Sequence, residues 1–173
     1  EADNNAEDLL RQADAALYKA KESGREQCSF YTSELTKAAL ERLNTESLLR
    51  DAFDKGDLSV YLQPQIDIVT GQLIGAEALL RWKTETGFIP PDTFIPVAEQ
   101  SGLIHPMGAW VMEKVCEVGK QWLDKGFSPI TLAVNLSSFQ LRHGNVVEMI
   151  KEILHKYDYP ASLLEVELTE SAL

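Results

Sequence analysis

The feature that most constrains the fold is a regular alternation of strand-like and helix-like segments after residue 57. Short runs of alternating polarity are followed by longer runs with apolar residues three and four positions apart, the pattern of repeated βα units. Units of this kind build a parallel sheet covered by helices. The expected strands are 58–62, closed by Pro64, then 73–82, 130–136 and 163–169, and the expected helices are 92–100, with Asp92 as its cap, 110–125 and 146–156.

Before residue 57 the chain is expected to be helical almost throughout. Apolar residues recur at helical spacing in 6–22 and again in 33–55, and Gly24 and Gly56 supply plausible stops. A short run at 28–31 is the one strand expected in this part. The spacing by itself supports ordinary amphipathic packing and nothing more specific.

The chain is acidic, with 16 Lys and Arg against 27 Asp and Glu and a formal net charge of −11. Binding to bulk nucleic acid or to an anionic membrane requires a basic surface, so this composition excludes both classes. No apolar run approaches the roughly 18 residues of a membrane span, and the N-terminus lacks a secretory signal. Two cysteines are too few for a disulfide scaffold. We therefore expect a cytoplasmic protein, with a membrane anchor in upstream segments left open.

Alternation within the predicted strands places three polar residues on comparable faces. Glu77, Asn135 and Glu167 each lie opposite the apolar face of their strand and toward its C-terminal half. In a (β/α)₈ barrel, that end of the strands carries the active site. Carboxylate and amide oxygens are the donors that Mg²⁺ and Mn²⁺ prefer. Parity by itself is about equally compatible with a divalent metal site and with three polar strand ends that simply face water.

Spacing narrows the architecture further. A (β/α)₈ barrel allots about 31 residues to each unit, and Asn135 and Glu167 are 32 positions apart. Residues 58–173 then amount to about half of a barrel. Because half a barrel leaves unpaired sheet edges, we expect a partial TIM-like (β/α)₈ fold of the α/β class, in a chain that looks incomplete.

Five blocks in a fixed order carry a resemblance to a known family. The Glu-Ala-Leu-Leu-Arg-Trp sequence at 77–82 is preceded by Tyr-Leu-Gln-Pro at 61–64 and followed by segments at 87–99, 135–137 and 167–171 that resemble those of the family in order. A single Glu-Ala-Leu would carry no weight, but the ordered set is specific. The chain is identified as a member of the EAL family of cyclic di-GMP phosphodiesterases.

The resemblance implies a reaction and a site. EAL enzymes open one phosphodiester of cyclic di-GMP to give linear pGpG, using two divalent ions, here Mg²⁺ or Mn²⁺. Glu77, Asn135 and Glu167 match the metal ligands of the family, and the two glutamates are catalytic for that reason. Glu170 is the third catalytic residue that the resemblance implies: it matches a position that steadies an active-site loop rather than binding metal, with an exposed or helix-capping carboxylate as the alternative. The partner implied is cyclic di-GMP.

Two further positions match substrate contacts. The Arg81 guanidinium suits a pair of phosphate oxygens, and the Gln63 amide suits a guanine or sugar edge. The chain ends at Leu173, before the family's Asp-Asp segment, lysine and later glutamate. We therefore expect the polypeptide to be inactive alone and the intact parent to be active. The alternative is a non-catalytic cyclic di-GMP receptor or interaction module.

The N-terminal part bears a second resemblance. The segment 13–25 is similar to the last helix and exit turn of a GGDEF, or diguanylate cyclase, domain. The implied domains are the end of a GGDEF domain at 1–31, a linker helix at 32–57 and half of an EAL domain at 58–173. This order implies upstream GGDEF and sensory domains in the parent chain. For the linker helix, a purely structural packing role and a role in relaying signals between the domains are equally compatible with the sequence. Homodimerisation is left open.

Overall fold

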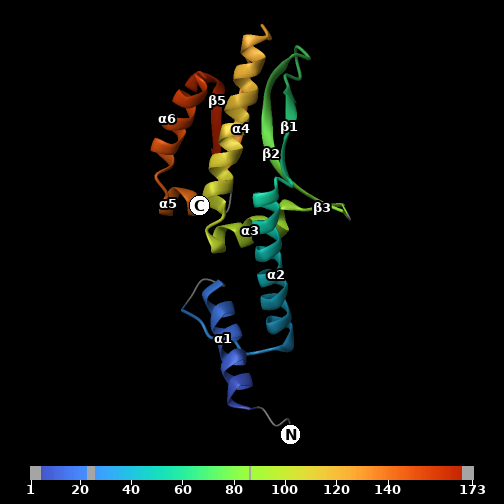
Figure 1. Ribbon diagram of the computed structural model, residues 1–173, viewed down its shortest axis with the longest axis vertical. Coiled ribbons are helices and arrows are strands. Elements are labelled where there is room, and N and C mark those ends of the chain that lie inside the picture. The colour runs from blue at the N-terminus through green and yellow to red at the C-terminus, as the bar shows by residue number, and fades with distance from the viewer. Residues whose placement is uncertain (1–4, 23–25, 86, 169–173) are drawn as a thin grey trace. The chain divides into compact units, whose positions relative to one another are not determined.

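The protein is described by a computed structural model that covers residues 5–22, 26–85 and 87–168 (Figure 1). The chain divides into two compact units, Glu1–Leu48 and Leu49–Leu173. The helix α2 (Ser33–Lys55) contributes residues to both units.

The first unit contains α1 (Ala6–Glu22) and the larger part of α2. Both helices begin and end at the predicted residues, so these two predictions are confirmed. The Arg42 guanidinium lies 4.4 Å from the centre of the Tyr18 ring, a cation–π contact. The predicted strand at 28–31 is wrong, because these residues pair with no strand of the described chain and Phe30 is 88% exposed.

The second unit is built on one mixed sheet with the strand order β1-β2-β4-β5, and β3 pairs with β2 beside this path. The pairing of β1 with β2 is antiparallel, whereas β2–β4 and β4–β5 are parallel. The sheet is open, and the predicted partial TIM-like α/β fold is confirmed. The strands are β1 (Leu58–Ile66), β2 (Leu73–Thr84), β3 (Gly87–Ile89), β4 (Thr131–Leu136) and β5 (Leu164–Leu168).

The first strand is longer than predicted because Pro64 does not end it. Pro64 pairs with Ala76 in the antiparallel register, and β1 continues to Ile66. Proline has no backbone N–H to donate and is tolerated where a strand lies at the edge of its sheet. β1 is such an edge strand, so the position of the strand in the sheet overrides the local stop signal.

The helices of the second unit confirm the alternation but shift its boundaries. Pro90, not Asp92, is the N-cap of α3, and Asp92 lies in its first turn. The helix α4 begins six residues earlier than predicted, because Pro106 falls in its first turn, where proline is tolerated. None of the helices among the described residues combines the length and apolar character needed to cross a membrane. The elements are α3 (Pro91–Ser101), α4 (Ile104–Asp124), α5 (Ser138–His143), α6 (Val146–Tyr157) and the 3₁₀ turn η1 (Ala161–Leu163).

The core lies between the sheet and α4, which runs beside the strands in Figure 1. The outward side chains of the central strands, among them Leu132 and Val134, pack against Met112 and Cys116 of α4. A second buried cluster surrounds Trp82, and it includes residues from the end of α2, from α3 and from the start of α4. Burial of apolar surface on this side leaves the opposite face of the sheet for polar residues.

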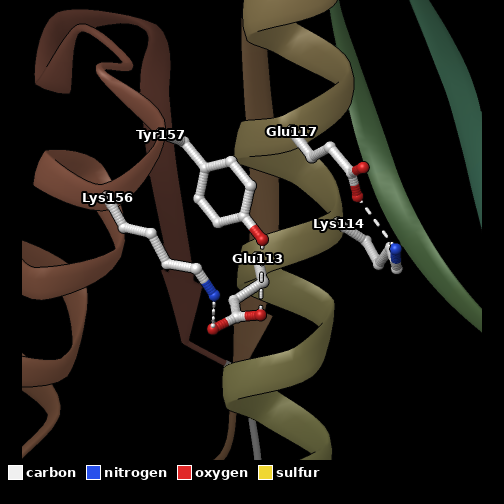
Figure 2. Close-up of polar contacts among 5 residues, drawn as sticks. All are labelled: Glu113, Lys114, Glu117, Lys156 and Tyr157. Carbon is white, nitrogen blue, oxygen red and sulfur yellow. Dashed lines mark hydrogen bonds and ion pairs between the residues drawn. The ribbon is translucent and has the colours of Figure 1, made fainter.

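Polar contacts tie α4 to α6 at the surface of the unit (Figure 2). Glu113 of α4 accepts hydrogen bonds from Lys156 Nζ at 2.9 Å and from the Tyr157 hydroxyl at 3.4 Å. Within α4, Lys114 Nζ lies 2.8 Å from Glu117. Exposed pairs of this kind contribute little to stability, so the apolar core carries the packing.

Replacing Leu132 by Ala in the middle of β4 should lower the free energy of unfolding by about 2–5 kcal/mol, because this fully buried side chain would leave a cavity. The matched surface variant Lys156→Ala should leave the unfolding midpoint within error. Urea unfolding followed by circular dichroism measures both. A larger loss for Lys156→Ala than for Leu132→Ala would contradict this assignment of the core.

Stability should fall as the pH rises above about 9. Burial raises the pKa of the Cys116 thiol to about 11 and that of the Tyr159 hydroxyl to about 12. Both groups fold in their neutral forms, so their contribution is complete below the unfolded pKa values and is lost as the pH rises through the folded ones. Tyr159→Phe and Cys116→Ala should each flatten the decline between pH 9 and 12 in chemical unfolding. An unchanged slope in both variants would show that other groups cause it.

Candidate functional site

The inner face of the sheet, opposite the helices, carries the polar residues predicted from strand parity. Ala76 and Ala78 of β2 are buried against the core, which turns Glu77 to the other side. The same alternation turns Asn135 of β4 and Glu167 of β5 away from their apolar neighbours. The three predicted ligands therefore share one face of three adjacent strands.

Strand register then brings these three residues to one end of that face. Asn135 Nδ2 donates a hydrogen bond to Glu77 Oε1 at 2.6 Å. Asn135 is also the register partner of Glu167 in the parallel pair of β4 and β5. Glu77 itself pairs with Ala133, so its carboxylate reaches Asn135 across the diagonal, past a residue with only a methyl side chain.

Gln63 and Arg81 flank this group on the same face. Gln63 of β1 is the antiparallel register partner of Glu77 and is exposed. Arg81 lies four residues beyond Glu77 along β2, so it also faces inward. Its Nη1 donates to the Leu80 carbonyl oxygen at 3.0 Å, and its guanidinium lies 6.0 Å from the centre of the Tyr61 ring. These contacts hold the cation over β1 and β2.

A cavity of about 450 Å³ lies between β2, α3 and the first half of α4, and none of Glu77, Gln63 and Glu167 lines it. Arg81 and Asn135 form part of its lining, and α3 adds the carboxylates of Asp92 and Glu99. Most of the remaining wall is apolar and comes from α3 and the first half of α4, for example Met107. A cavity of this size with a few convergent polar groups suits a small organic ligand.

The donor set suits a hard divalent cation better than zinc. Within the described part of the chain, no three His, Cys, Asp or Glu side chains gather at one point. Glu77 and Glu167 offer carboxylates, and Asn135 offers an amide. Rotating the Asn135 side-chain amide by half a turn would point its carbonyl oxygen, instead of its N–H group, to the side where Glu77 lies. Two carboxylates with an amide oxygen are ligands typical of Mg²⁺ or Mn²⁺.

One predicted site residue is not described by the structure, and two buried polar residues next to Asn135 were not predicted. Glu170 lies outside the described residues. Ser137 and Gln140, just beyond Asn135, are 5% and 3% exposed, and neither was predicted as a site residue. The signal was present, because Ser-x-x-Gln is the pattern of a helix capping box.

Comparisons with known proteins point to one family. The profile of the EAL domain matches residues 46–173. The chain is 38% identical to MucR of Pseudomonas aeruginosa, named a bifunctional diguanylate cyclase/cyclic di-GMP phosphodiesterase, and 39% identical to the cyclic di-GMP phosphodiesterase PdeR of Escherichia coli. Each alignment includes 95% of this chain, which spans 24% and 25% of those proteins. The solved complex of the P. aeruginosa MucR phosphodiesterase with c-di-GMP superposes with a TM-score of 0.71 at 37% identity, over 75% of this chain and 53% of that one.

Replacing Asn135 by Asp should place a second carboxylate at hydrogen-bond distance from Glu77. Repulsion of about 1 kcal/mol would lower the unfolding midpoint at pH 8 by about 2–4 °C. The repulsion raises the pKa of one carboxylate, so stability is retained at low pH and is lost as the pH rises through that value. Thermal unfolding in EDTA between pH 4 and 8 measures this, and Asn135→Ala is the control without a new charge. An identical pH dependence in both variants would contradict the proximity of the two side chains.

Proposed function

The chain belongs to the EAL domain family, and on that basis we propose that residues 58–173 form the N-terminal half of a domain that hydrolyses cyclic di-GMP to linear pGpG. The observation that carries the proposal is the hydrogen bond between Asn135 and Glu77, with Glu167 in register beside them. Hard oxygen donors from three adjacent strands are what a divalent-metal site requires. The same ends of the strands carry active sites in (β/α)₈ enzymes.

The reaction adds one water to one phosphodiester. The water oxygen bonds to phosphorus, the P–O bond to a ribose 3′ oxygen breaks, and the proton passes to that oxygen. Glu77, Asn135 and Glu167 would hold Mg²⁺ or Mn²⁺, and a bound ion supplies Lewis-acid chemistry that lowers the pKa of water and offsets phosphate charge. Neutral Asn135 would ligate the ion without adding negative charge near an anionic substrate.

Two residues on the same face would bind and orient the dinucleotide. The Arg81 guanidinium can donate two parallel hydrogen bonds to a phosphate, and its packing over Tyr61 restricts its conformations. The Gln63 amide, next to Glu77 across the β1–β2 pair, would contact a guanine or sugar edge. Glu170 would steady an active-site loop. The similarity to a phosphodiesterase solved with c-di-GMP supports this assignment of ligand.

Residues 1–31, which lie within the first unit, would be the end of a diguanylate cyclase domain in the same parent protein. The alignment to the bifunctional MucR includes 95% of the chain and therefore extends into this unit. We propose that the GGDEF domain ends at residue 31, that the linker helix occupies 32–57 and that the EAL domain begins at 58, so that α2 connects the two domains. We also propose that sensory domains lie upstream in the parent protein and that the two domains are cytoplasmic. A relay role for α2 is consistent with its contribution to both compact units.

Replacing Glu167 by Ala should weaken Mn²⁺ binding by at least about 10-fold, because a carboxylate ligand is lost. Glu165→Ala is the matched control, since Glu165 lies on the same strand and the same face two residues earlier. Calorimetry of the 173-residue chain with Mn²⁺ measures the affinities. In a protein that carries the whole domain, Glu167→Ala and Glu77→Ala should abolish conversion of cyclic di-GMP to pGpG, whereas Glu165→Ala should retain it.

The outcomes separate the alternatives. Equal Mn²⁺ affinity for Glu167→Ala and Glu165→Ala would refute the ligand assignment. Tight binding of cyclic di-GMP by the whole domain without turnover, and without any dependence on Mn²⁺, would favour a receptor over an enzyme. We expect metal-dependent turnover by the whole domain, and weak or no binding of cyclic di-GMP by the 173-residue chain alone.

A further inference from the structure

Buried serine and glutamine side chains cluster at one place in the described chain. Ser137, Ser138 and Gln140 are 5%, 8% and 3% exposed, and they follow Asn135 where β4 gives way to α5. A buried polar group is costly unless it is hydrogen-bonded. The conformation of this turn should therefore depend on the contacts that these side chains make.

The side chains of Gln140 and Ser137 each accept one backbone hydrogen bond and together close the turn. Gln140 Oε1 accepts from the Ser137 backbone N–H at 3.1 Å, and Ser137 Oγ accepts from the Phe139 backbone N–H at 3.0 Å. This capping box stabilises the chain two residues after Asn135. The α5 helix has six residues, too few to form stably by itself, so the cap and the tertiary contacts decide where it begins.

A glycine on α4 makes room for the Gln140 side chain. A Cβ atom at Gly108 would lie 2.0 Å from Gln140 Nε2 and 3.1 Å from its Cδ. No residue other than glycine fits there unless the amide moves. The Gln140 amide thus joins two elements, because its oxygen holds the turn after β4 and its nitrogen lies against the backbone of α4.

The helix α4 provides a rigid reference for this contact. Gly119 lies eleven residues, or three turns, beyond Gly108 and so on the same face of the helix. A Cβ at Gly119 would lie 2.5 Å from the Tyr159 ring. Gly108 therefore makes room for Gln140 at the start of α5, and Gly119 makes room for Tyr159 just after α6. Only the contact at Gly108 is near Asn135.

We propose that Gln140 is a positioning residue for Asn135 and that Gly108 is the recess that holds it. The turn fixes the end of β4 against α4, which keeps the Asn135 side chain on the inner face beside Glu77. A slip of one residue would turn Asn135 toward the helices. The functional consequence rests on the proposed role of Asn135 as a metal ligand, whereas the positioning itself does not.

The test follows the side-chain amide of Asn135 by NMR in the metal-free 173-residue chain, with Asn135→Ala to assign its signals. Gln140→Met keeps the length of the side chain but removes the acceptor for the Ser137 N–H. Gly108→Ala leaves Gln140 intact and closes its recess. Both variants should shift and broaden the Asn135 amide signals and should weaken Mn²⁺ binding by about 10-fold.

Two control variants separate positioning from general loss of stability. Gln140→Glu keeps a carboxyl oxygen for the Ser137 N–H and should retain the wild-type Asn135 signals. Gly119→Ala makes a comparable clash on the same face of α4, with Tyr159; it should lower the unfolding midpoint without moving the Asn135 signals. If Gln140→Met and Gly108→Ala do not fold, the milder Ser137→Ala takes their place, with a smaller shift expected.

Unchanged Asn135 signals in folded Gln140→Met, Gly108→Ala or Ser137→Ala would overturn the proposal. So would equal shifts in Gly119→Ala, because the effect would then be general. If the Asn135 signals respond as expected while Mn²⁺ affinity is the same in the wild type, in Gln140→Met and in Glu167→Ala, the metal-ligand assignment fails and the positioning of Asn135 by Gln140 stands.

Discussion

The parallel pairing of β4 with β2 on one side and with β5 on the other is the constraint on which the candidate site depends. It places the carboxyl ends of three strands side by side, although the strands come from distant parts of the sequence. With Asn135 opposite Glu167, and Glu77 opposite Ala133, the polar side chains converge on one face. The site is therefore a consequence of register, and its geometry is only as well defined as the ends of these strands.

The two faces of the sheet divide the physical tasks of the domain. The outer face is apolar and packs on α4, whose buried side chains, such as Met112 and Cys116, supply most of the contact. The inner face is polar and acidic, because Glu77, Glu165 and Glu167 all project from it by parity. One face thus provides stability through burial, and the other carries groups that a core would not tolerate.

Electrostatics sets the main problem for the proposed function. A chain with a net charge of −11, with further carboxylates from Asp92 and Glu99 around the cavity, would repel a dianionic nucleotide. A divalent cation at the inner face would reverse the local sign, and Arg81 adds a positive charge next to the same cavity. Acidity therefore disfavours bulk nucleic acid as a partner and is compatible with a nucleotide bound through metal ions.

The sequence by itself determined the two N-terminal helices and the faces of the strands. Helices 6–22 and 33–55 match the structure at both ends, and parity identified Glu77, Asn135 and Glu167 as inward-facing, because side-chain alternation is a property of each strand alone. Only the tertiary structure decided which strands are neighbours and how their ends are held. The edge position of β1 allows Pro64 within a strand, and the recess at Gly108 accommodates Gln140 beyond the end of β4. Both depend on contacts between residues remote in sequence, which local periodicity does not encode.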